Sequence, residues 1–266
     1  MAQAAGPLVL LLTATVDPGR MIHVTRSDPR RRFKDYQQAL KKWCRVPAFH
    51  SIIFCENSGF DISSLREWAA SAPDARTRLR FISFQGNDYP PHLGKGYGEI
   101  AILKHAVSSA GLNDHTLLVK VTGRYYVRNV NTLIDQICAH PECGVFCNAD
   151  SDRRFADSSV FAATVSFYER YLFPLHSQIN DSTGVYFEHV LADAIRAGMG
   201  AGIRWMPWSR PLRLSGVSGS SNLSYSQPGH ALGRARVWML RRTYRMRRLL
   251  GLYRRPRNPA DRPSVP

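Results

Sequence analysis

The sequence predicts an α/β fold, with a single domain built on a mostly parallel central sheet. Two observations predict it. Apolar runs of β type alternate with segments of helical period along most of the chain, an order that favours parallel strands with helices on both faces. The chain has 266 residues, of which 44% are hydrophobic, so it can bury a sizeable core. We expect one globular domain over residues 1–228 and a separate tail over 229–266, partly disordered at its end.

The first half of the chain gives the alternation most clearly. Pro7 to Val16 is rich in Leu and Val, as a buried central strand is, and it ends at a Pro-Gly turn. A helix is expected from Asp28-Pro29, because Asp caps a helix and Pro suits its first position. The following elements are expected to be strands over 51–56 and 79–84 and a helix over 62–70.

The second half continues the pattern. A loop rich in Gly and Pro covers 86–98, and it leads into a helix over 97–109 and a strand over 116–121. The remaining expected elements are a short strand and helix after residue 124, strands over 144–148 and 158–164, and helices over 165–172 and 181–197.

The charge is concentrated at the carboxyl end. The formal net charge is +16, and the 11 Arg against one acid between Gly229 and Pro266 give +10 to the tail and leave +6 for the residues before it. Arg alternates there with apolar residues at helical spacing, which is typical of a basic amphipathic helix on an anionic membrane surface. The alternatives are a solvated helix or one that folds onto the domain. No nucleic-acid-binding motif accompanies the charge, so we expect no nucleic acid.

The cysteines and the apolar run near the N-terminus indicate the cellular compartment. The five cysteines are an odd number without paired C-x-x-C spacing, which favours a reducing compartment over a disulfide framework or a zinc site. The apolar run over 6–16 lacks a basic leader and a cleavage pattern, and it is too short to span a bilayer. We therefore expect a cytoplasmic protein, peripheral at the inner face of the membrane.

A glycine-rich stretch, HLGKGYGE, precedes the expected helix over 97–109. Its glycines would let the backbone approach a phosphate at the helix start, with Lys95 and Gly96 as donor-binding residues. The Walker spacing is absent, and an ordinary flexible loop is the alternative.

The stretches YPPHLGKGYGE, KVTGRYYV, NADSDRRFADS and GVYFEH resemble nucleotide-sugar glycosyltransferases of the GT-A fold, and more closely a bacterial group associated with surface polysaccharides such as lipopolysaccharide and capsule. The resemblance spans roughly Leu8 to Tyr225. It implies a Rossmann-like GT-A domain, a nucleotide-sugar donor, and a glycan or lipid-linked acceptor. It also makes a divalent cation, Mn²⁺ or Mg²⁺, a possible cofactor.

One departure from the family pattern concerns the donor phosphates. Where metal-binding members carry an Asp-x-Asp motif, this chain has Thr122, Gly123 and Arg124. An Arg fork binds phosphate oxygens bidentately, so the diphosphate could be neutralised without a metal. Alternatively, Arg124 pairs with a structural carboxylate. We place Thr13 and Lys120 in the same donor-binding set, although a Lys along a strand is also common as a structural residue.

Two acidic stretches are candidates for other roles. Asp150 and Asp152, followed by Arg153, could bind a divalent cation or the acceptor, or could form a turn with satisfied carboxylates. If a metal is used, this is where we expect it. Glu188 matches the acid that inverting members use to deprotonate the acceptor hydroxyl. Its neighbour His189 departs from the family's acidic pair, and Glu188 alternatively favours a helix start.

The stretch over 215–221, rich in Gly and Ser, could close over a diphosphate through Ser218 and Ser220, or could be a linker to the tail. Together these residues predict a hexosyl-type, inverting glycosyltransferase of cell-surface glycan biosynthesis. The rival classes are a non-catalytic membrane-associated protein and a nucleic-acid-binding basic protein. The first rival would tolerate loss of Arg124 and Glu188. The second would lose affinity steeply with salt and would carry basic charge over the face of the domain.

Overall fold

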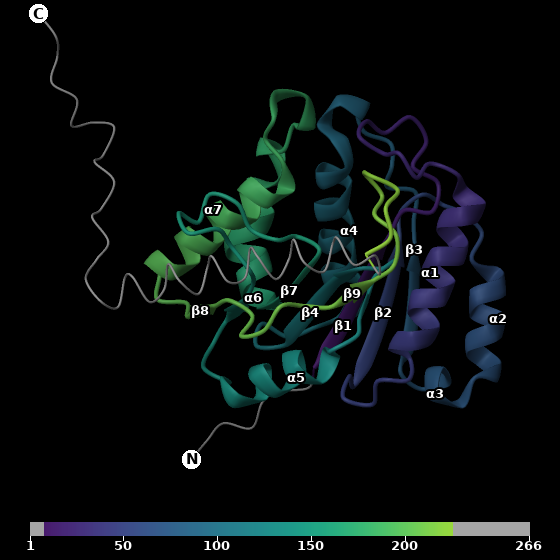
Figure 1. Ribbon diagram of the computed structural model, residues 1–266, viewed down its shortest axis with the longest axis horizontal. Helices are drawn as coiled ribbons and strands as arrows, with labels where there is room; N and C mark the ends of the chain where they lie inside the picture. The colour runs from purple at the N-terminus through teal and green to yellow at the C-terminus, as the bar shows by residue number, and fades with distance from the viewer. Residues whose placement is uncertain (1–7, 226–266) are drawn as a thin grey trace, which may run out of the picture.

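The central sheet is covered by helices on both sides (Figure 1). The structure is a computed structural model that describes residues 8–225. The expected tail over 229–266, and with it the expected membrane contact, lies outside the described residues. Within the described range, no helix is both long and apolar enough to cross a membrane.

Seven strands form the main sheet in the order β3-β2-β1-β4-β7-β6-β8. β1 pairs in parallel with β2 and β4, and β2 pairs in parallel with β3, so four adjacent strands end at one edge. The expected α/β class with a mostly parallel sheet is confirmed. The strands of this sheet are β1 Val9–Ala14, β2 Ser51–Glu56, β3 Leu79–Ser83, β4 Leu117–Thr122, β6 Val145–Phe146, β7 Val160–Thr164 and β8 Trp205–Met206.

The alternation of side chains along β1 divides the core into two layers. Leu10 and Leu12 point to the layer built with α1, α2, α3 and α5, whereas Val9 and Leu11 point to the layer built with α4, η2 and α7. The helical elements are α1 Pro29–Trp43, α2 Ser63–Ser71, α3 Pro73–Arg76, η1 Pro91–Leu93, α4 Gly94–Ala110, α5 Val130–Ala139, α6 Val165–Phe167, η2 Tyr168–Leu172, η3 Phe173–Gln178, η4 Asp181–Thr183 and α7 Phe187–Gly200.

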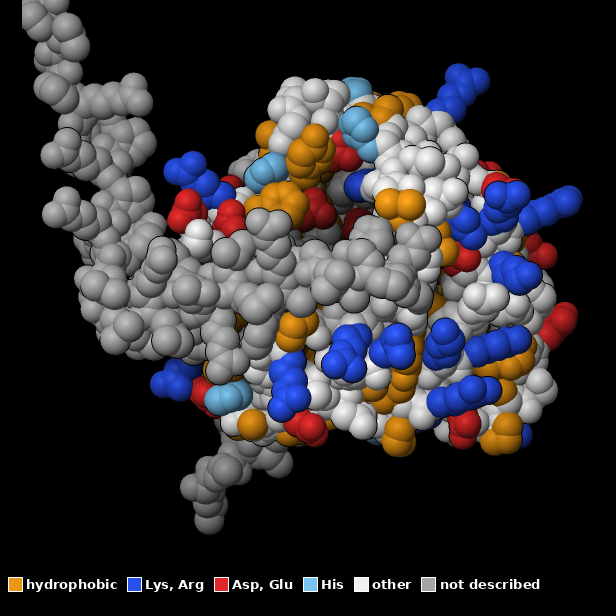
Figure 2. All heavy atoms as spheres, viewed as in Figure 1, with side chains coloured by type: hydrophobic (Ala, Val, Ile, Leu, Met, Phe, Trp, Pro, Cys, Tyr) orange, Lys and Arg blue, Asp and Glu red, His pale blue; other side chains and the backbone are white. Residues whose placement is uncertain are grey.

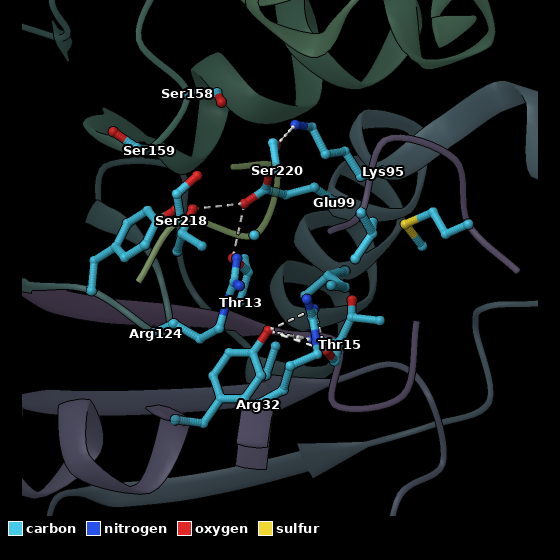
Figure 3. Close-up of a pocket in the computed structure, with 18 of the residues that line it drawn as sticks. Thr13, Thr15, Arg32, Lys95, Glu99, Arg124, Ser158, Ser159, Ser218 and Ser220 are labelled. Atoms are coloured by element: carbon cyan, nitrogen blue, oxygen red, sulfur yellow. Dashed lines mark hydrogen bonds between the residues drawn. The ribbon is translucent and has the colours of Figure 1, made fainter. Parts of the chain in front are cut away.

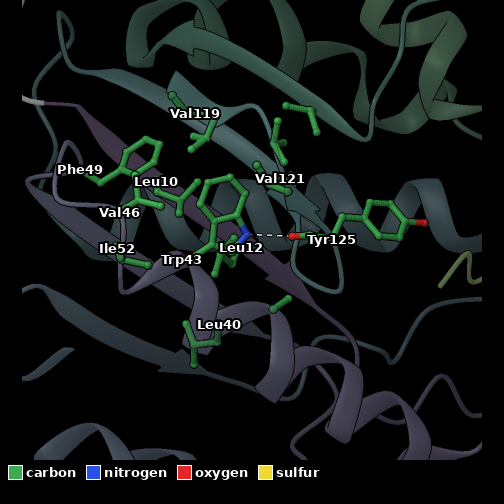
Figure 4. Close-up of a cluster of buried hydrophobic side chains, with 14 of the residues drawn as sticks. Leu10, Leu12, Leu40, Trp43, Val46, Phe49, Ile52, Val119, Val121 and Tyr125 are labelled. Atoms are coloured by element: carbon green, nitrogen blue, oxygen red, sulfur yellow. Dashed lines mark hydrogen bonds between the residues drawn. The ribbon is translucent and has the colours of Figure 1, made fainter. Parts of the chain in front are cut away.

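Trp43 anchors the end of α1 in the first layer (Figure 4). Its side chain is fully buried, and its indole nitrogen donates to the carbonyl of Tyr125 at 2.8 Å. At the other end of α1, the side chain of Asp28 accepts from the backbone nitrogens of Arg30 and Arg31, as the expected helix start requires. The Trp43 contact holds α1 against the chain segment that follows β4, and the Asp28 contacts cap the first turn of the helix.

Three details differ from the sequence expectation. β7 runs antiparallel to both β4 and β6, a direction that an apolar run does not encode. α4 begins at Gly94, so the glycines of HLGKGYGE lie in its first turn and not in a loop. The helix expected over 181–197 is broken, because Gly184 has a φ of 79° and separates η4 from α7.

A second sheet of two antiparallel strands joins β5 Tyr126–Val127 to β9 Leu214–Ser215. A bridge between Val217 and Ser224 continues from β9. Through this pairing, the stretch rich in Gly and Ser returns to the segment that follows β4. It is therefore part of the domain and not only a linker.

Candidate functional site

A cavity of about 310 Å³ lies at the edge where the parallel strands β1 and β4 end. Ligands of open α/β sheets bind at this edge. Acidic and basic side chains are visible in a hollow of the surface in Figure 2, and Figure 3 shows the cavity side chains. The lining includes Thr13, Thr15, Arg32, Tyr36, Lys95, Glu99, Thr122, Arg124, Asp157, Ser158, Ser159, Glu188, Ser218, Gly219 and Ser220.

Arg124 is a buried cation without hydrogen-bond partners for two of its nitrogens. Its side chain belongs to a residue only 7% exposed, and Nε and Nη1 are buried and unpaired within residues 8–225. The guanidinium lies 5.7 Å from the ring centres of both Tyr36 and Tyr125. Burial acts to lower the pKa of Arg124, but the two tyrosines, with Asp35 and Glu99, keep it above its ordinary value. The side chain is therefore charged.

Gly219 lies directly against this guanidinium. A Cβ there would stand 2.7 Å from Nη2 of Arg124, so a larger residue would displace the guanidinium. The Gly219 carbonyl accepts from the backbone nitrogens of Thr25 and Arg26 at 2.9 and 3.1 Å. The next residue, Ser220, accepts from the ammonium of Lys95. The stretch over 215–225 is thus fastened over the cavity from two sides.

A second cation, Lys120, is fully paired. Its ammonium is 0% exposed and donates to the Ser158 carbonyl at 2.5 Å and to Thr122 Oγ1 at 3.3 Å. It also forms an ion pair with Glu99 of α4, and the rings of Phe161 and Phe187 flank it at 5.8 Å. Lys120, expected among the donor-binding residues, does not line the cavity, but it contacts Glu99 and Thr122, which do.

The Glu99 carboxylate, the partner of Lys120, lines the cavity together with Arg124. Its Oε1 accepts from Thr13 Oγ1 at 3.0 Å and from Thr122 Oγ1 at 3.3 Å. Burial acts to raise the pKa of Glu99, but Lys120, the Thr13 hydrogen bond and the charge of Lys95 hold it below its ordinary value. The group is an anion at neutral pH.

Glu188 is a second carboxylate of the cavity. It lies in the first turn of α7, where an acid is favoured by the helix dipole. Its Oε1 accepts from Ser158 Oγ at 2.7 Å, which fixes the side chain toward the end of β4. Asp157 and Ser159 lie beside it, and Ser159 donates to Asp157 Oδ1 through its backbone nitrogen at 3.1 Å.

The remaining donor-binding candidates, Gly96 and Gly123, are packing positions. A Cβ on Gly96 would stand 2.9 Å from Cβ of Phe187, so α4 and α7 meet there. A Cβ on Gly123 would stand 2.8 Å from the carbonyl oxygen of Thr13. The same oxygen accepts a hydrogen bond from the Gly123 backbone nitrogen at 2.8 Å. Neither glycine lines the cavity.

The residues expected to bind the acceptor or to play a secondary role also lie outside the cavity lining. Asp150 accepts from the backbone nitrogens of Arg154 and Phe155 at 2.8 and 3.3 Å, the pattern of a turn. Asp152 accepts from Ser151, and Arg153 holds a left-handed φ of 53° in the same turn. His189 Nδ1 accepts from the Tyr186 backbone nitrogen at 3.1 Å and so caps α7.

The described residues offer no cluster of three or more His, Cys, Asp or Glu side chains that could hold a metal ion. At the strand end where a carboxylate pair would hold a divalent cation, the chain presents the unpaired guanidinium of Arg124. A positive charge at this place repels a metal ion. The strand end beside Arg124 therefore does not fit a divalent cation.

Sequence reasoning missed Glu99, Arg32, Ser158 and Ser159. Arg32 is 5% exposed, and its guanidinium donates to the carbonyls of Thr15 and Arg26. Burial is the main cause that lowers its pKa. Glu99 is the last residue of the stretch HLGKGYGE, but only the fold brings it to Lys120.

No protein-family model matches the chain, and no curated protein matches it. Several solved structures follow a similar course. A mannosyltransferase from Pyrobaculum calidifontis, described in complex with GDP-Man and Mn²⁺, is 13% identical with a TM-score of 0.48 over 75% of this chain and 54% of that chain. This chain thus spans about half the length of that enzyme.

Two further solved structures are similar at comparably low identity. The galactosyltransferase LgtC, in complex with donor and acceptor sugar analogues, is 12% identical with a TM-score of 0.46 over 74% of this chain and 72% of that chain. The 4-diphosphocytidyl-2C-methyl-D-erythritol synthase from Anaerococcus prevotii is 11% identical with a TM-score of 0.40 over 86% and 96%. Likenesses of this size do not identify an activity.

Proposed function

We propose that this protein transfers a sugar from a nucleoside-diphosphate sugar to a hydroxyl group of an acceptor. The observation that carries the proposal is the guanidinium of Arg124, buried, charged and without partners for two nitrogens, in a cavity at the carboxyl ends of parallel strands. An unpaired buried charge is costly, so its retention favours a ligand of opposite charge.

A diphosphate is the anion that suits this place. The planar fork of Arg binds two phosphate oxygens at once. Lys95 of α4 lines the same cavity and donates to Ser220, so a second cation lies beside the stretch that closes over the ligand. When the sugar leaves, negative charge develops on the diphosphate, and donors already fixed around it stabilise that charge.

Glu188 is proposed as the general base. In the reaction, the acceptor oxygen forms a bond to the anomeric carbon while the bond from that carbon to the diphosphate oxygen breaks. The electron pair of the broken bond stays on the diphosphate, and the acceptor proton moves to the Glu188 carboxylate. A single displacement of this kind inverts the anomeric configuration. The Ser158 hydrogen bond to Glu188 fixes the base.

The acceptor and the cellular place are proposed from the sequence. The resemblance to enzymes of surface-polysaccharide synthesis and the basic character of the tail support a glycan or lipid-linked acceptor at the inner face of a bacterial membrane. On this proposal the anionic membrane surface is a partner and nucleic acid is not.

The experiment is a thermal-shift measurement with nucleoside diphosphates and monophosphates, each in EDTA and in Mn²⁺. The variants are Arg124→Met and the control Arg128→Met, which removes an exposed cation outside the cavity lining. We expect a diphosphate-specific stabilisation in EDTA that survives in R128M and disappears in R124M. Absence of any shift in the unaltered protein would contradict the proposal, and a shift that requires Mn²⁺ would contradict its metal-free form.

A further inference from the structure

Glu99 is an anion in a cavity whose cations are assigned above to a diphosphate. It comes from α4, and Figure 3 shows it beside Thr13 in the same cavity as Arg124. Its side chain is 19% exposed, so part of the carboxylate faces the cavity. A group of this charge does not bind phosphate, and the proposed function leaves it without a role.

The carboxylate is fixed through one oxygen. Oε1 takes the contacts to Thr13, Thr122 and Lys120. Oε2 has no hydrogen-bond partner within the described range 8–225. An ionised carboxylate offers about four lone-pair sites. Because the contacts to Thr13, Thr122 and Lys120 all end on Oε1 and the side chain lines the cavity, the carboxylate can accept further hydrogen bonds from a ligand.

Glu99 does not suit the role of general base. The neighbouring Lys120 holds its pKa below the ordinary range, against the effect of burial. A base with a depressed pKa draws a proton weakly at neutral pH. A fixed anionic acceptor is better suited to binding hydroxyl groups, which are hydrogen-bond donors.

We propose that Glu99 selects the donor sugar: it accepts hydrogen bonds from the hydroxyl groups of an uncharged sugar and repels a sugar that carries a carboxylate. The inference rests on the proposed function, since it assigns the sugar end of the same ligand. Lys120 is then a positioning residue, because it holds the Glu99 carboxylate charged and in place. The substrate class is a nucleoside-diphosphate hexose and not a nucleoside-diphosphate uronate.

The test is calorimetric binding in EDTA of two matched pairs, UDP-glucose with UDP-glucuronate and GDP-mannose with GDP-mannuronate. UDP and GDP alone are measured beside them. For the nucleotide that binds, we expect the neutral sugar to bind at least about tenfold more tightly than the uronate, because like charges placed together oppose binding. The ratio in the unaltered protein is decisive without any variant.

The charge-balanced double variant E99Q/K120M sharpens the test. The single change E99Q would leave the Lys120 ammonium buried and unpaired, whereas the double change removes both charges. We expect the ratio to fall to about threefold or less in the double variant, mainly through tighter uronate binding. E67Q, which alters an exposed acid of α2, keeps the ratio of the unaltered protein.

The outcomes separate the two proposals. Equal affinity for hexose and uronate in the unaltered protein would overturn the selection by Glu99 while leaving nucleotide binding intact, as would an unchanged ratio in a folded double variant. Failure of UDP, GDP and both pairs to bind would overturn the proposed function and this inference together.

Discussion

Lys120 and Arg124 lie four residues apart at the end of β4. Both place a positive charge in the interior, but they differ in how many partners that charge has. Lys120 has a carboxylate, a carbonyl and a hydroxyl as partners. Arg124 has two tyrosine rings and a glycine backbone around it, but no partner for Nε and Nη1 within 8–225. On our proposal, Lys120 therefore stabilises the folded protein, whereas Arg124 binds the ligand.

The largest effect is expected from Glu188→Gln, which tests whether the cavity that Arg124 serves is catalytic. The amide cannot take the acceptor proton, so turnover should fall by about 10²–10⁴-fold. Nucleotide affinity should stay within about threefold, because the change does not touch the cations. Steady-state kinetics with the donor that binds would measure both. Glu169→Gln, an exposed acid on η2, is the matched control. Equal turnover of the two variants would contradict the role of Glu188.

Lys120→Met tests the other side of the comparison. Removing one partner of a buried ion pair leaves the Glu99 carboxylate uncompensated, so the free energy of unfolding should fall by about 3–5 kcal/mol. Urea unfolding followed by circular dichroism would measure it. A loss below about 1 kcal/mol, the usual value of an exposed pair, would show that the Lys120 pair is not structural.

The pH dependence of stability tests the same ion pair, Glu99 with Lys120. The pKa of Glu99 is lower in the folded protein than its unfolded value of about 4.3. Its contribution is therefore complete above the unfolded pKa and is lost as the pH falls through the lower folded pKa. The difference in unfolding free energy between the unaltered protein and Glu99→Gln should thus shrink below about pH 4. A difference that is constant from pH 6 to pH 3 would contradict the ion pair.

The smallest effect is expected from the double change Asp150→Asn and Asp152→Asn. Asn keeps an oxygen that can accept from the turn backbone, so stability should change by less than about 1 kcal/mol. Nucleoside-diphosphate affinity should change by less than about twofold, in Mn²⁺ as in EDTA. A Mn²⁺-dependent affinity that disappears in this variant would place a metal at the turn and break the account of Arg124.

The order of the elements could be predicted from the sequence because apolar periodicity reports burial and helix caps report boundaries. β2 is found at its expected bounds, and the start of α1 follows from Asp28 and Pro29. The direction of β7 could not be predicted, since a strand buried on both faces reads the same in either direction.

Part of the candidate site could be predicted from residue types at strand ends, at helix starts and in stretches rich in Gly. Arg124 after an apolar strand and Glu188 near a helix start both stood out, and both line the cavity. Glu99 could not be found, because a Glu in a helix is common and its meaning comes from Lys120, which lies 21 positions later in the chain. Glycines near a helix start suggested phosphate binding, whereas Gly96 is required by the close packing of α4 on α7.

The most direct test of the central claim is urea unfolding of Arg124→Met, with and without the nucleoside diphosphate that stabilises the unaltered protein. Because Met removes a charge that lacks partners, the free energy of unfolding without ligand should stay within about 1 kcal/mol of the unaltered protein or rise. The diphosphate should then add no stability. A loss as large as that of Lys120→Met, together with an undiminished response to the diphosphate, would show that Arg124 is structural and contradict the account.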